Sequence, residues 1–383
     1  MSVFAEALKS IDKQQKEKRK QAGRGAGFDL QDIWHNCRLY VRAQSGQLLY
    51  PVVMERTEQK YGYSLLLHLP VGLSDIHFRA RLHSIAWALG GDIELEALRG
   101  KLYLKVLTGE IKNFYKYKDP FQFINGKVAM PVPVGYGREG LIILDIANAP
   151  HLLVGGGSGG GKSNWIHQAI CTLLAANVNV YIIDLKRLEF AWYNQHATCV
   201  HTEKGALQVL QQVEAEMDRR MALLENKVVK VQDWKGPEEL PYIVVFIDEI
   251  AELQDEKAWG ILNRLVRLAR ALGISIVAAT QRPSTKTIDG DTRALFTARL
   301  SFRVADRKNS EIIIDGPAAS YLPTLPGRAI FRHGNKAREV QTMFLQVPEG
   351  LLKVLSKIPA RKQAEQAEKL EPAAPIEEIK TKP

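Results

Sequence analysis

The sequence has few cysteines, and they do not form a recognisable pattern. Cys37, Cys171 and Cys199 stand at irregular spacing in a chain of 383 residues, without a CxxC pair. This spacing argues against a structural zinc site and against a small secreted scaffold held by disulfides. We therefore expect a reducing, cytosolic environment.

Long apolar runs are also missing. No stretch approaches the roughly 18 to 20 consecutive apolar residues that cross a bilayer. The opening segment, MSVFAEALKSIDKQQKEKRK, lacks the apolar core of a signal sequence. We expect a cytoplasmic protein, whose membrane association, if any, is through a partner.

Length and composition indicate a folded protein with two domains. Single cores rarely grow beyond roughly 250 to 300 residues, and this chain is longer. Hydrophobic residues make up 46% and charged residues 25%, which is ordinary for a globular protein. The formal net charge of +10 suits a polyanion such as DNA or acidic lipid, although a solvated basic surface gives the same value.

Changes of pattern along the chain predict four regions. Residues 1–28 form a flexible basic arm, either a solvated tail or a DNA contact, and residues 29–125 form a small α+β domain. Residues 126–350 form a larger α/β domain, and residues 351–383 a charged helix followed by a disordered tail.

One helix of the small domain is predicted in detail. Ser74 is a suitable N-cap, and Gly90 and Gly91 stop the helix. Apolar residues recur between them at the spacing of one buried face. These are Phe78, Leu82, Ile85 and Leu89. Strands are expected around this helix, including DIELEAL and KLYLKVL on either side of a turn at Gly100.

The larger domain alternates short apolar runs with long helical stretches. The runs begin near residues 151, 178, 242, 274 and 298. Almost continuous apolar strands that alternate with helices indicate a parallel sheet covered on both faces.

A glycine-rich segment lies between the first of these strands and the following helix. It matches GxxxxGKS, in which backbone N–H groups converge on a phosphate chain at the positive end of a helix. Lys162 is expected to reach the β- and γ-phosphates, and the Ser163 hydroxyl to bind Mg²⁺. The predicted nucleotide-binding residues are Gly156, Gly157, Ser158, Gly159, Gly160, Gly161, Lys162 and Ser163.

Polar residues end two of the later strands. Asp248 and Glu249 follow YIVVFI, so that Asp248 is expected to hold the metal and Glu249 to polarise the attacking water. Gln281 ends ISIVAAT and is expected either to sense the γ-phosphate or simply to terminate the strand.

These segments together resemble the FtsK/SpoIIIE DNA translocases. HLLVGGGSGGGKS, IIDLKRLEF, EAEMDRRMALL, PYIVVFIDEIAEL, ARALGISIVAATQRPS and TARLSFRVADRKNSEIIID occur in the family's order, over roughly residues 130 to 335. The resemblance implies a RecA-like P-loop NTPase that uses ATP and Mg²⁺. It also implies a ring, usually hexameric, with double-stranded DNA in its channel.

The resemblance further suggests which residues act between subunits and on DNA. An arginine of a neighbouring subunit would complete each ATP site, with Arg299 preferred over Arg270, although either can instead form an ion pair within its own chain. Sequence-indifferent phosphate contacts are expected from mobile basic loops, where solvated loop charge is the alternative. The candidates are Lys227, Lys230, Arg282 and Lys286.

Some features depart from the chromosome-segregating members. Membrane spans and a carboxyl-terminal winged-helix module are not found, and DLKRLEF, LPGRAIFRHG and EVQTMFL resemble versions carried by conjugative and other mobile DNA. We expect an ATP-hydrolysing double-stranded DNA translocase that serves plasmid or mobile-element transfer or maintenance. The alternatives are an ATPase that energises protein export, or an ATP-dependent assembly switch that recruits a relaxase or replication protein.

Overall fold

The computed structural model describes residues 30–359, except 99–100, 125, 188, 226, 229, 285–287 and 335. The expected basic arm and the end of the expected tail lie outside these residues. The chain divides into two compact units. The first contains the described residues up to Asn113 together with Tyr136–Gly140, and the second contains Phe114–Gly135 and the described residues from Leu141 onward.

The first unit is a small α+β structure. Its antiparallel sheet has the order β3-β4-β6-β5, and a separate ladder joins β1 to β2. Side chains of one sheet face pack against the helices, with Leu65 and Leu104 contributing from the strands and Trp34 and Phe78 from the helices. The elements are α2 (Leu30–Asn36), β1 (Val41–Arg42), β2 (Leu48–Leu49), β3 (Val52–Gln59), β4 (Gly62–His68), α3 (Asp75–Ala80), α4 (Leu82–Leu89), β5 (Asp92–Leu98) and β6 (Lys101–Leu107).

The helix predicted after Ser74 is interrupted. Phe78 and Ile85 are fully buried, so the predicted apolar face is confirmed. The prediction of one continuous helix is wrong, because Arg81 leaves helical geometry at φ −115° and ψ 9°. The N–H of Arg81 bonds to the carbonyl of Phe78, closing α3 with a tight turn before α4 starts.

The second unit is built on a ten-stranded sheet with the order β11-β10-β12-β13-β9-β14-β15-β16-β7-β8. Parallel ladders join β11 through β14, and β15 and β16 then add antiparallel ladders. All five apolar runs predicted as strands are strands, and the α/β class is confirmed. The strands are β7 (Pro131–Gly137), β8 (Gly140–Asp145), β9 (Leu152–Gly155), β10 (Asn179–Ile183), β11 (Thr198–Val200), β12 (Ile243–Ile247), β13 (Ile274–Thr280), β14 (Ala298–Phe302), β15 (Arg328–His333) and β16 (Lys336–Gln341).

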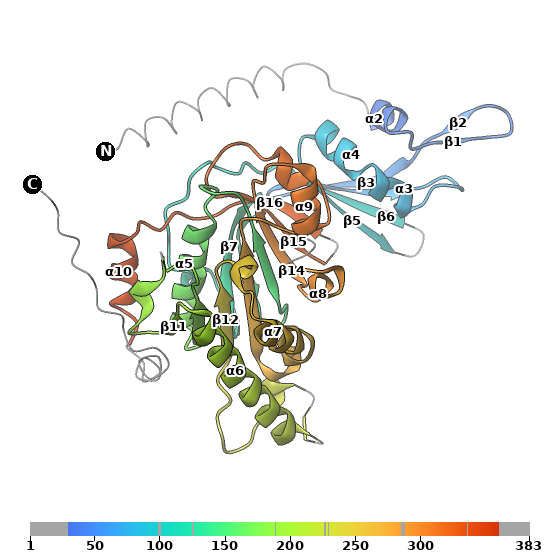
Figure 1. The fold of residues 1–383 in the computed structure, drawn as a ribbon. Helices are drawn as coiled ribbons and strands as arrows, with labels where there is room; N and C mark the ends of the chain where they lie inside the picture. The colour runs from blue at the N-terminus through green and yellow to red at the C-terminus, as the bar shows by residue number, and fades with distance from the viewer. Residues whose placement is uncertain are drawn as a thin grey trace, which may run out of the picture. The chain divides into compact units, whose positions relative to one another are not determined.

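Helices cover both faces of this sheet (Figure 1). Alternate strand residues point to opposite faces, so Val244 and Phe246 join one core while Val245 and Ile247 join the other. α5 (Lys162–Ala175) and α10 (Glu349–Leu355) supply the first core. α6 (Glu203–Leu224), α7 (Glu256–Leu268) and α9 (Arg307–Ile314) supply the second, and the short α8 (Gly290–Ala294) precedes β14.

The segment that follows residue 350 contributes to the core. Leu351, Leu355 and Ile358 are buried among the residues around α5. A ring nitrogen of His196 also lies 3.2 Å from the Ile358 carbonyl oxygen. The described part of the predicted charged helix therefore packs into the second unit.

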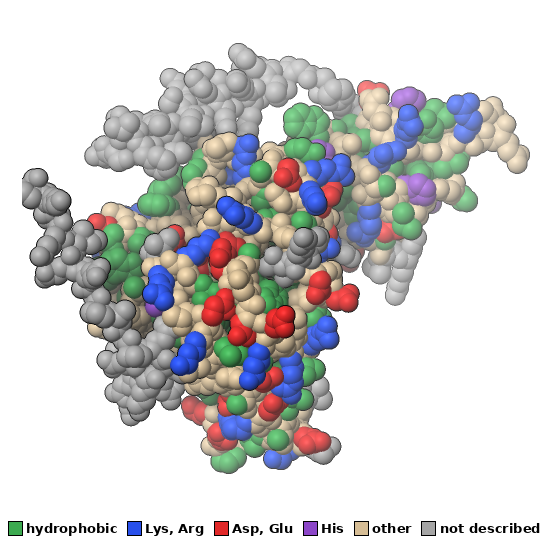
Figure 2. Space-filling view, viewed as in Figure 1, with side chains coloured by type: hydrophobic (Ala, Val, Ile, Leu, Met, Phe, Trp, Pro, Cys, Tyr) green, Lys and Arg blue, Asp and Glu red, His purple; other side chains and the backbone are tan. Residues whose placement is uncertain are grey.

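The surface over α6 and α7 carries both signs of charge. Figure 2 shows acidic and basic side chains interspersed there. Arg264 of α7, for example, pairs with Glu214 and Asp218 of α6 at 3.0 and 2.6 Å. Within the described part of the chain, every helix is too short or too polar to cross a bilayer.

Candidate nucleotide site

The predicted site residues meet at one edge of the large sheet. Because β9, β10, β12 and β13 are parallel, the segments that follow their carboxyl ends share an edge. The glycine-rich loop follows β9, the acidic pair follows β12, and Gln281 follows β13. The strand order β12-β13-β9 brings these three segments next to one another.

The loop between β9 and α5 depends on its glycines. Gly156, Gly159 and Gly161 have φ angles of 157°, 74° and 104°, which side-chain-bearing residues rarely adopt. There is also no room for a side chain at two of these positions. A Cβ on Gly156 would lie 2.6 Å from the Cβ of Phe302, and one on Gly161 would lie 2.7 Å from the amide nitrogen of Gly327. The loop backbone is thus close-packed against the residues around it.

Neighbouring strands hold this loop in place. The N–H of Gly157 donates to the carbonyl of Arg303, just beyond β14, at 3.0 Å. The N–H of Gly327, just before β15, donates to the carbonyl of Gly160 at 2.8 Å. The loop is consequently fixed from the β14–β15 side, and its last residues open α5 with the positive end of the helix toward the site.

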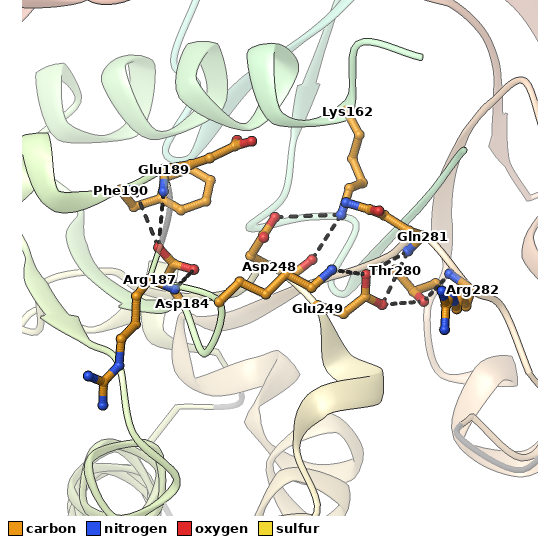
Figure 3. A network of polar contacts seen from close by, with 11 residues as sticks. Lys162, Asp184, Arg187, Glu189, Phe190, Asp248, Glu249, Thr280, Gln281 and Arg282 are labelled. Atoms are coloured by element: carbon orange, nitrogen blue, oxygen red, sulfur yellow. Dashed lines mark hydrogen bonds and ion pairs between the residues drawn. The ribbon is translucent and has the colours of Figure 1, made fainter. Parts of the chain in front are cut away.

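Lys162 points toward the acidic strand end (Figure 3). Its side chain is buried, and its Nζ donates to the backbone carbonyl of Asp248 at 3.0 Å. The same Nζ lies 3.5 Å from the Oδ1 of Asp248. A phosphate group placed on the loop would compete with Asp248 for this cation.

Asp248 carries a buried carboxylate oxygen that suits a cation. Its side chain is 8% exposed, and its Oδ1 accepts no hydrogen bond from the described residues. Burial raises the pKa of Asp248, with Lys162 acting against the rise and Glu189 adding to it.

These donors fit Mg²⁺. Ser163, which follows Lys162 in the first turn of α5, is partly buried and can offer a hydroxyl oxygen. No group of three metal-ligating side chains occurs in the described ranges. A magnesium ion held by Ser163 and Asp248 would therefore complete its shell with phosphate oxygens and water, as Mg²⁺ commonly does.

Glu249 is held by donors from two neighbouring strands. Its Oε1 accepts the Thr280 hydroxyl at 2.7 Å, and its Oε2 accepts the N–H of Gln281 at 2.9 Å and the Nζ of Lys186 at 3.0 Å. The carboxylate is buried and has a fixed orientation. Gln281 thus contacts Glu249 through its backbone N–H. The role expected for its side chain, to sense the γ-phosphate, stays a prediction.

Two residues at the end of β10 were not assigned roles from the sequence. Lys186 binds Glu249, and Asp184 is buried with its carboxylate accepting the backbone N–H groups of Arg187 and Phe190 at 3.1 and 3.4 Å. Figure 3 shows Asp184 near Asp248 of the acidic pair. The sequence signal for this position was Asp184 itself, an acidic residue at the end of an apolar run. Its strand, β10, pairs with β12, so Asp184 lies near the acidic pair.

The two candidate arginines lie away from the loop of their own chain. Arg299 is the second residue of β14 and pairs with Leu153 of β9, toward the opposite edge of the sheet. It is 8% exposed, and its side chain donates to Asp315 at 2.6 Å and to the carbonyl of Phe296 at 3.1 Å. Arg299 thus forms an ion pair within its own chain, which was the alternative to a role between subunits. Arg270 is exposed in the 3₁₀ segment Ala269–Leu272, where a neighbouring molecule can reach it.

The predicted DNA contacts are not brought together. Arg282 is exposed and follows Gln281 at the nucleotide edge. Lys227 and Lys230 are exposed between α6 and β12, at the other edge, where the Nζ of Lys227 lies 5.6 Å from the ring centroid of Trp234. Lys286 lies outside the described residues.

A close-packed glycine loop ending in Lys-Ser, with an acidic pair on a nearby strand, defines a P-loop nucleotide hydrolase domain. The model of the FtsK/SpoIIIE family matches residues 116–236. This match covers about a third of the chain, and this region is therefore similar to the FtsK/SpoIIIE family, as its motifs predicted.

Sequence relatives of this domain include curated DNA translocases. The DNA translocase FtsK of Campylobacter jejuni strain 81-176 is 35% identical over 219 residues, which is 52% of this chain and 23% of the relative. The DNA translocase FtsK of Treponema pallidum is 36% identical over 219 residues, which is 52% of this chain and 27% of the relative. The chain thus spans about a quarter of the length of these relatives.

Solved structures show the same fold. The monomer form of the pCW3 conjugation coupling protein TcpA with ATPγS superposes with a TM-score of 0.61 at 24% identity, covering 85% of this chain and 97% of that one. The cytoplasmic domain of the Thermomonospora curvata type VII secretion ATPase EccC gives 0.54 at 20% identity, covering 64% and 33%. The predicted RecA-like fold is confirmed.

Proposed function

We propose that this protein hydrolyses ATP in order to move double-stranded DNA. The observation that carries the proposal is the meeting of Lys162, Asp248 and Glu249 at the mouth of the glycine loop. A switch protein needs the loop and the metal ligand, whereas hydrolysis also needs a base for water. Glu249, held by Thr280, Gln281 and Lys186, is placed to act as that base.

The residues divide the work as follows. The N–H groups of the loop bind the phosphate oxygens, and Lys162 exchanges the Asp248 carbonyl for the β- and γ-phosphates. Ser163 and Asp248 would hold Mg²⁺, which neutralises phosphate charge when bound. Glu249 accepts the proton of the attacking water. Arg270 of a neighbouring copy, exposed in each subunit, would stabilise charge on the transferred group.

DNA is the proposed substrate because the sequence relatives are named DNA translocases. Arg282 also supports DNA as the substrate. This exposed residue directly follows Gln281, whose backbone N–H donates to the Glu249 carboxylate. Phosphate contact at Arg282 can therefore act on the hydrolytic site through one backbone hydrogen bond. A hexameric ring around the duplex is part of the proposal.

We assign this motor to plasmid or mobile-element DNA, with a relaxase or a membrane protein as a further partner. DLKRLEF and LPGRAIFRHG support this setting, because they resemble versions carried by mobile DNA. Their residues also lie at the site, Lys186 in the first stretch and Gly327 in the second.

Two assays test the proposal in sequence. Phosphate release is measured with and without duplex DNA, and triplex displacement then reports movement. DNA-stimulated hydrolysis with displacement supports the translocase. Hydrolysis indifferent to DNA points to export, and stimulation without displacement points to an assembly switch. Absence of phosphate release at every protein concentration contradicts the ATPase role itself.

A further inference from the structure

Two aromatic side chains are exposed as a pair in the second unit. Phe114 and Phe344 are 47% and 46% exposed, and their ring centroids are 5.9 Å apart at an interplanar angle of 44°. They come from segments separated by more than half the chain. Exposed aromatic rings in contact offer apolar area that a planar ligand can cover.

The backbone under Phe344 is held from both sides. The N–H of Phe344 donates to the carbonyl of Tyr115 at 2.7 Å, and its carbonyl accepts the N–H of Tyr117 at 2.9 Å. On the other side, Asn164 accepts the N–H of Leu345 at 3.1 Å and donates to its carbonyl at 2.6 Å. The ring of Phe344 is therefore carried by a backbone with little freedom.

These contacts connect Phe344 to the phosphate loop. Asn164 directly follows Ser163, the residue that ends the loop motif. Gln168, one turn further along α5, donates to the carbonyl of Met343 at 2.6 Å. The segment that carries Phe344 thus lies along the first turns of the helix whose amino end faces the phosphates.

The direction of the Phe344 side chain follows from the burial of its neighbours. Met343 and Leu345 are buried on either side of the exposed Phe344, so the ring points away from the core that these two residues enter. Thr342 lies against Gly327, since a Cβ on Gly327 would approach the Thr342 hydroxyl to 2.8 Å. Gly327 in turn donates to Gly160 of the loop. Phe344 therefore lies two residues beyond Thr342, which is linked to the phosphate loop through Gly327.

Strand order places the aromatic pair across the loop from the acidic residues. Asp248 and Glu249 follow β12, on the β13 side of β9, whereas Phe344 follows β16, on the β14 side. A nucleoside triphosphate with its γ-phosphate at Lys162 and Glu249 extends its sugar and base toward the other side. On that side of the loop, the exposed pair of Phe344 and Phe114 offers an apolar surface to such a base.

We propose that Phe344, supported by Phe114, stacks on the purine base of the bound nucleotide, and that Asn164 positions it. This inference rests on the proposed binding of ATP. It adds a residue that recognises the base, which is the part of a nucleotide that free polyphosphate lacks. Stacking on an aromatic face tolerates either purine, so the platform selects for a base and not for one exocyclic group.

The test separates base from phosphate recognition. Calorimetry measures the Kd of magnesium ATP and of magnesium tripolyphosphate, which has no base, for the wild type, Phe344→Ala and Phe344→Trp. We expect Phe344→Ala to weaken ATP about 5- to 100-fold, on the scale of base–aromatic stacking, and to leave tripolyphosphate unchanged. Phe344→Trp should keep ATP affinity, and its added fluorescence should change with ATP but not with tripolyphosphate.

Phe121→Ala is the matched control, because Phe121 is 39% exposed in the same connecting region and should alter neither Kd. Equal weakening of both ligands by Phe344→Ala would reduce Phe344 to a support of the loop and overturn the inference. Unchanged ATP affinity in Phe344→Ala would also overturn it. If the wild type binds neither ligand, it is the nucleotide site that fails.

Discussion

Lys162 is buried in contact with the acidic strand end, at 3.0 Å from the carbonyl oxygen of Asp248. Its replacement by Ala removes a cation that no other described side chain on the loop can replace. We expect magnesium ATP to bind Lys162→Ala about 10- to 150-fold more weakly, the scale of a hydrogen bond to a charged group. Calorimetry checks this, with the exposed Lys204→Ala as control. Unchanged affinity would contradict the placement of the phosphates.

Glu249→Gln is expected to separate binding from turnover. The amide oxygen of Gln can still accept from Thr280 or Gln281, but it cannot take a proton from water. Hydrolysis should fall about 10²- to 10⁴-fold, while ATP stays bound. Single-turnover phosphate release measures the loss, and Glu252→Gln, exposed in the 3₁₀ segment Ile250–Glu252, should hydrolyse like the wild type. A normal rate in Glu249→Gln would move the base role elsewhere.

The sequence predicts the site residues that its local motifs contain. Lys162 belongs to the loop motif, and Asp248 and Glu249 end an apolar run, so each could be assigned without knowing its neighbours. Lys186 could not, because its contact with Glu249 requires β10 to lie beside β12. The intrachain pairing of Arg299 likewise needed Asp315 to be brought next to it.

Arg220 joins three elements of the second unit. It is fully buried in α6 and donates to Glu216 at 2.7 Å, to the Pro241 carbonyl at 2.7 Å and to the Leu272 carbonyl at 2.8 Å. Pro241 precedes β12 and Leu272 precedes β13, so this guanidinium ties α6 to the starts of both strands.

Removing that guanidinium leaves the buried Leu272 carbonyl and the Pro241 carbonyl without this donor, and it takes one of two arginine partners from Glu216. We expect Arg220→Ala to lower the free energy of unfolding by about 3 to 5 kcal/mol, as for one partner lost from a buried ion pair. The neighbouring Arg219 also pairs with Glu216, but its side chain is 42% exposed, so Arg219→Ala should cost about 1 kcal/mol or less. Urea denaturation of the two variants makes the comparison, and equal losses would contradict this role for Arg220.

Two buried histidines flank the phosphate loop and make stability depend on pH. Burial lowers the pKa of His151, before β9, and of His167, in α5, from 6.5 to about 4. Between those values the unfolded chain binds protons that the folded chain does not, so stability falls as the pH drops from 6.5 toward 4. The reason at His151 is specific, because its Nδ1 accepts the N–H of Ile276 at 2.9 Å and cannot do so when protonated.

Each histidine should remove up to about 3 kcal/mol once it is protonated. Thermal unfolding from pH 8 to pH 4 measures the loss, and His167→Gln should flatten part of it. His83→Gln, at an exposed position of α4, should leave the profile as in the wild type. A wild-type unfolding temperature that stays constant down to pH 4 would rule out this account.

At the element scale, the five apolar runs predicted the parallel strands β9, β10, β12, β13 and β14, because a strand buried on both faces is mostly apolar, whereas the three-residue parallel strand β11 was not predicted. Local pattern was less informative where a single residue or a short segment decides the structure. The break at Arg81 lies inside a regular apolar spacing, and the burial of Leu351 and Leu355 depends on α5 supplying a partner surface.

At the scale of the whole molecule, the basic loops proposed to bind DNA lie at opposite edges of the large sheet. Lys227 and Lys230 precede β12, whereas Arg282 follows β13. The sequence shows both loops as basic and polar, but only the strand order shows that they are separated by the length of the strands. A duplex that contacts both must therefore run along the strands past both edges of the sheet.

This arrangement predicts additive effects on DNA binding. Each phosphate contact contributes about 0.9 to the slope of log K against log salt concentration, because it releases condensed counterions. Replacing Lys227 and Lys230 together by Gln should reduce the slope by about 1.8, replacing Arg282 by about 0.9, and the triple variant by their sum. Contacts more than a Debye length apart do not compensate for one another, which is why the losses should add.

Fluorescence anisotropy of a labelled duplex across a salt series measures these slopes. Lys353→Gln with Lys357→Gln is the matched control, because both lysines are exposed at α10 and the pair removes the same charge. If the control lowers the slope as much as the loop variants do, DNA responds to net charge alone. If only one loop variant changes the slope, the duplex touches one edge of the sheet, and the path along the strands is wrong.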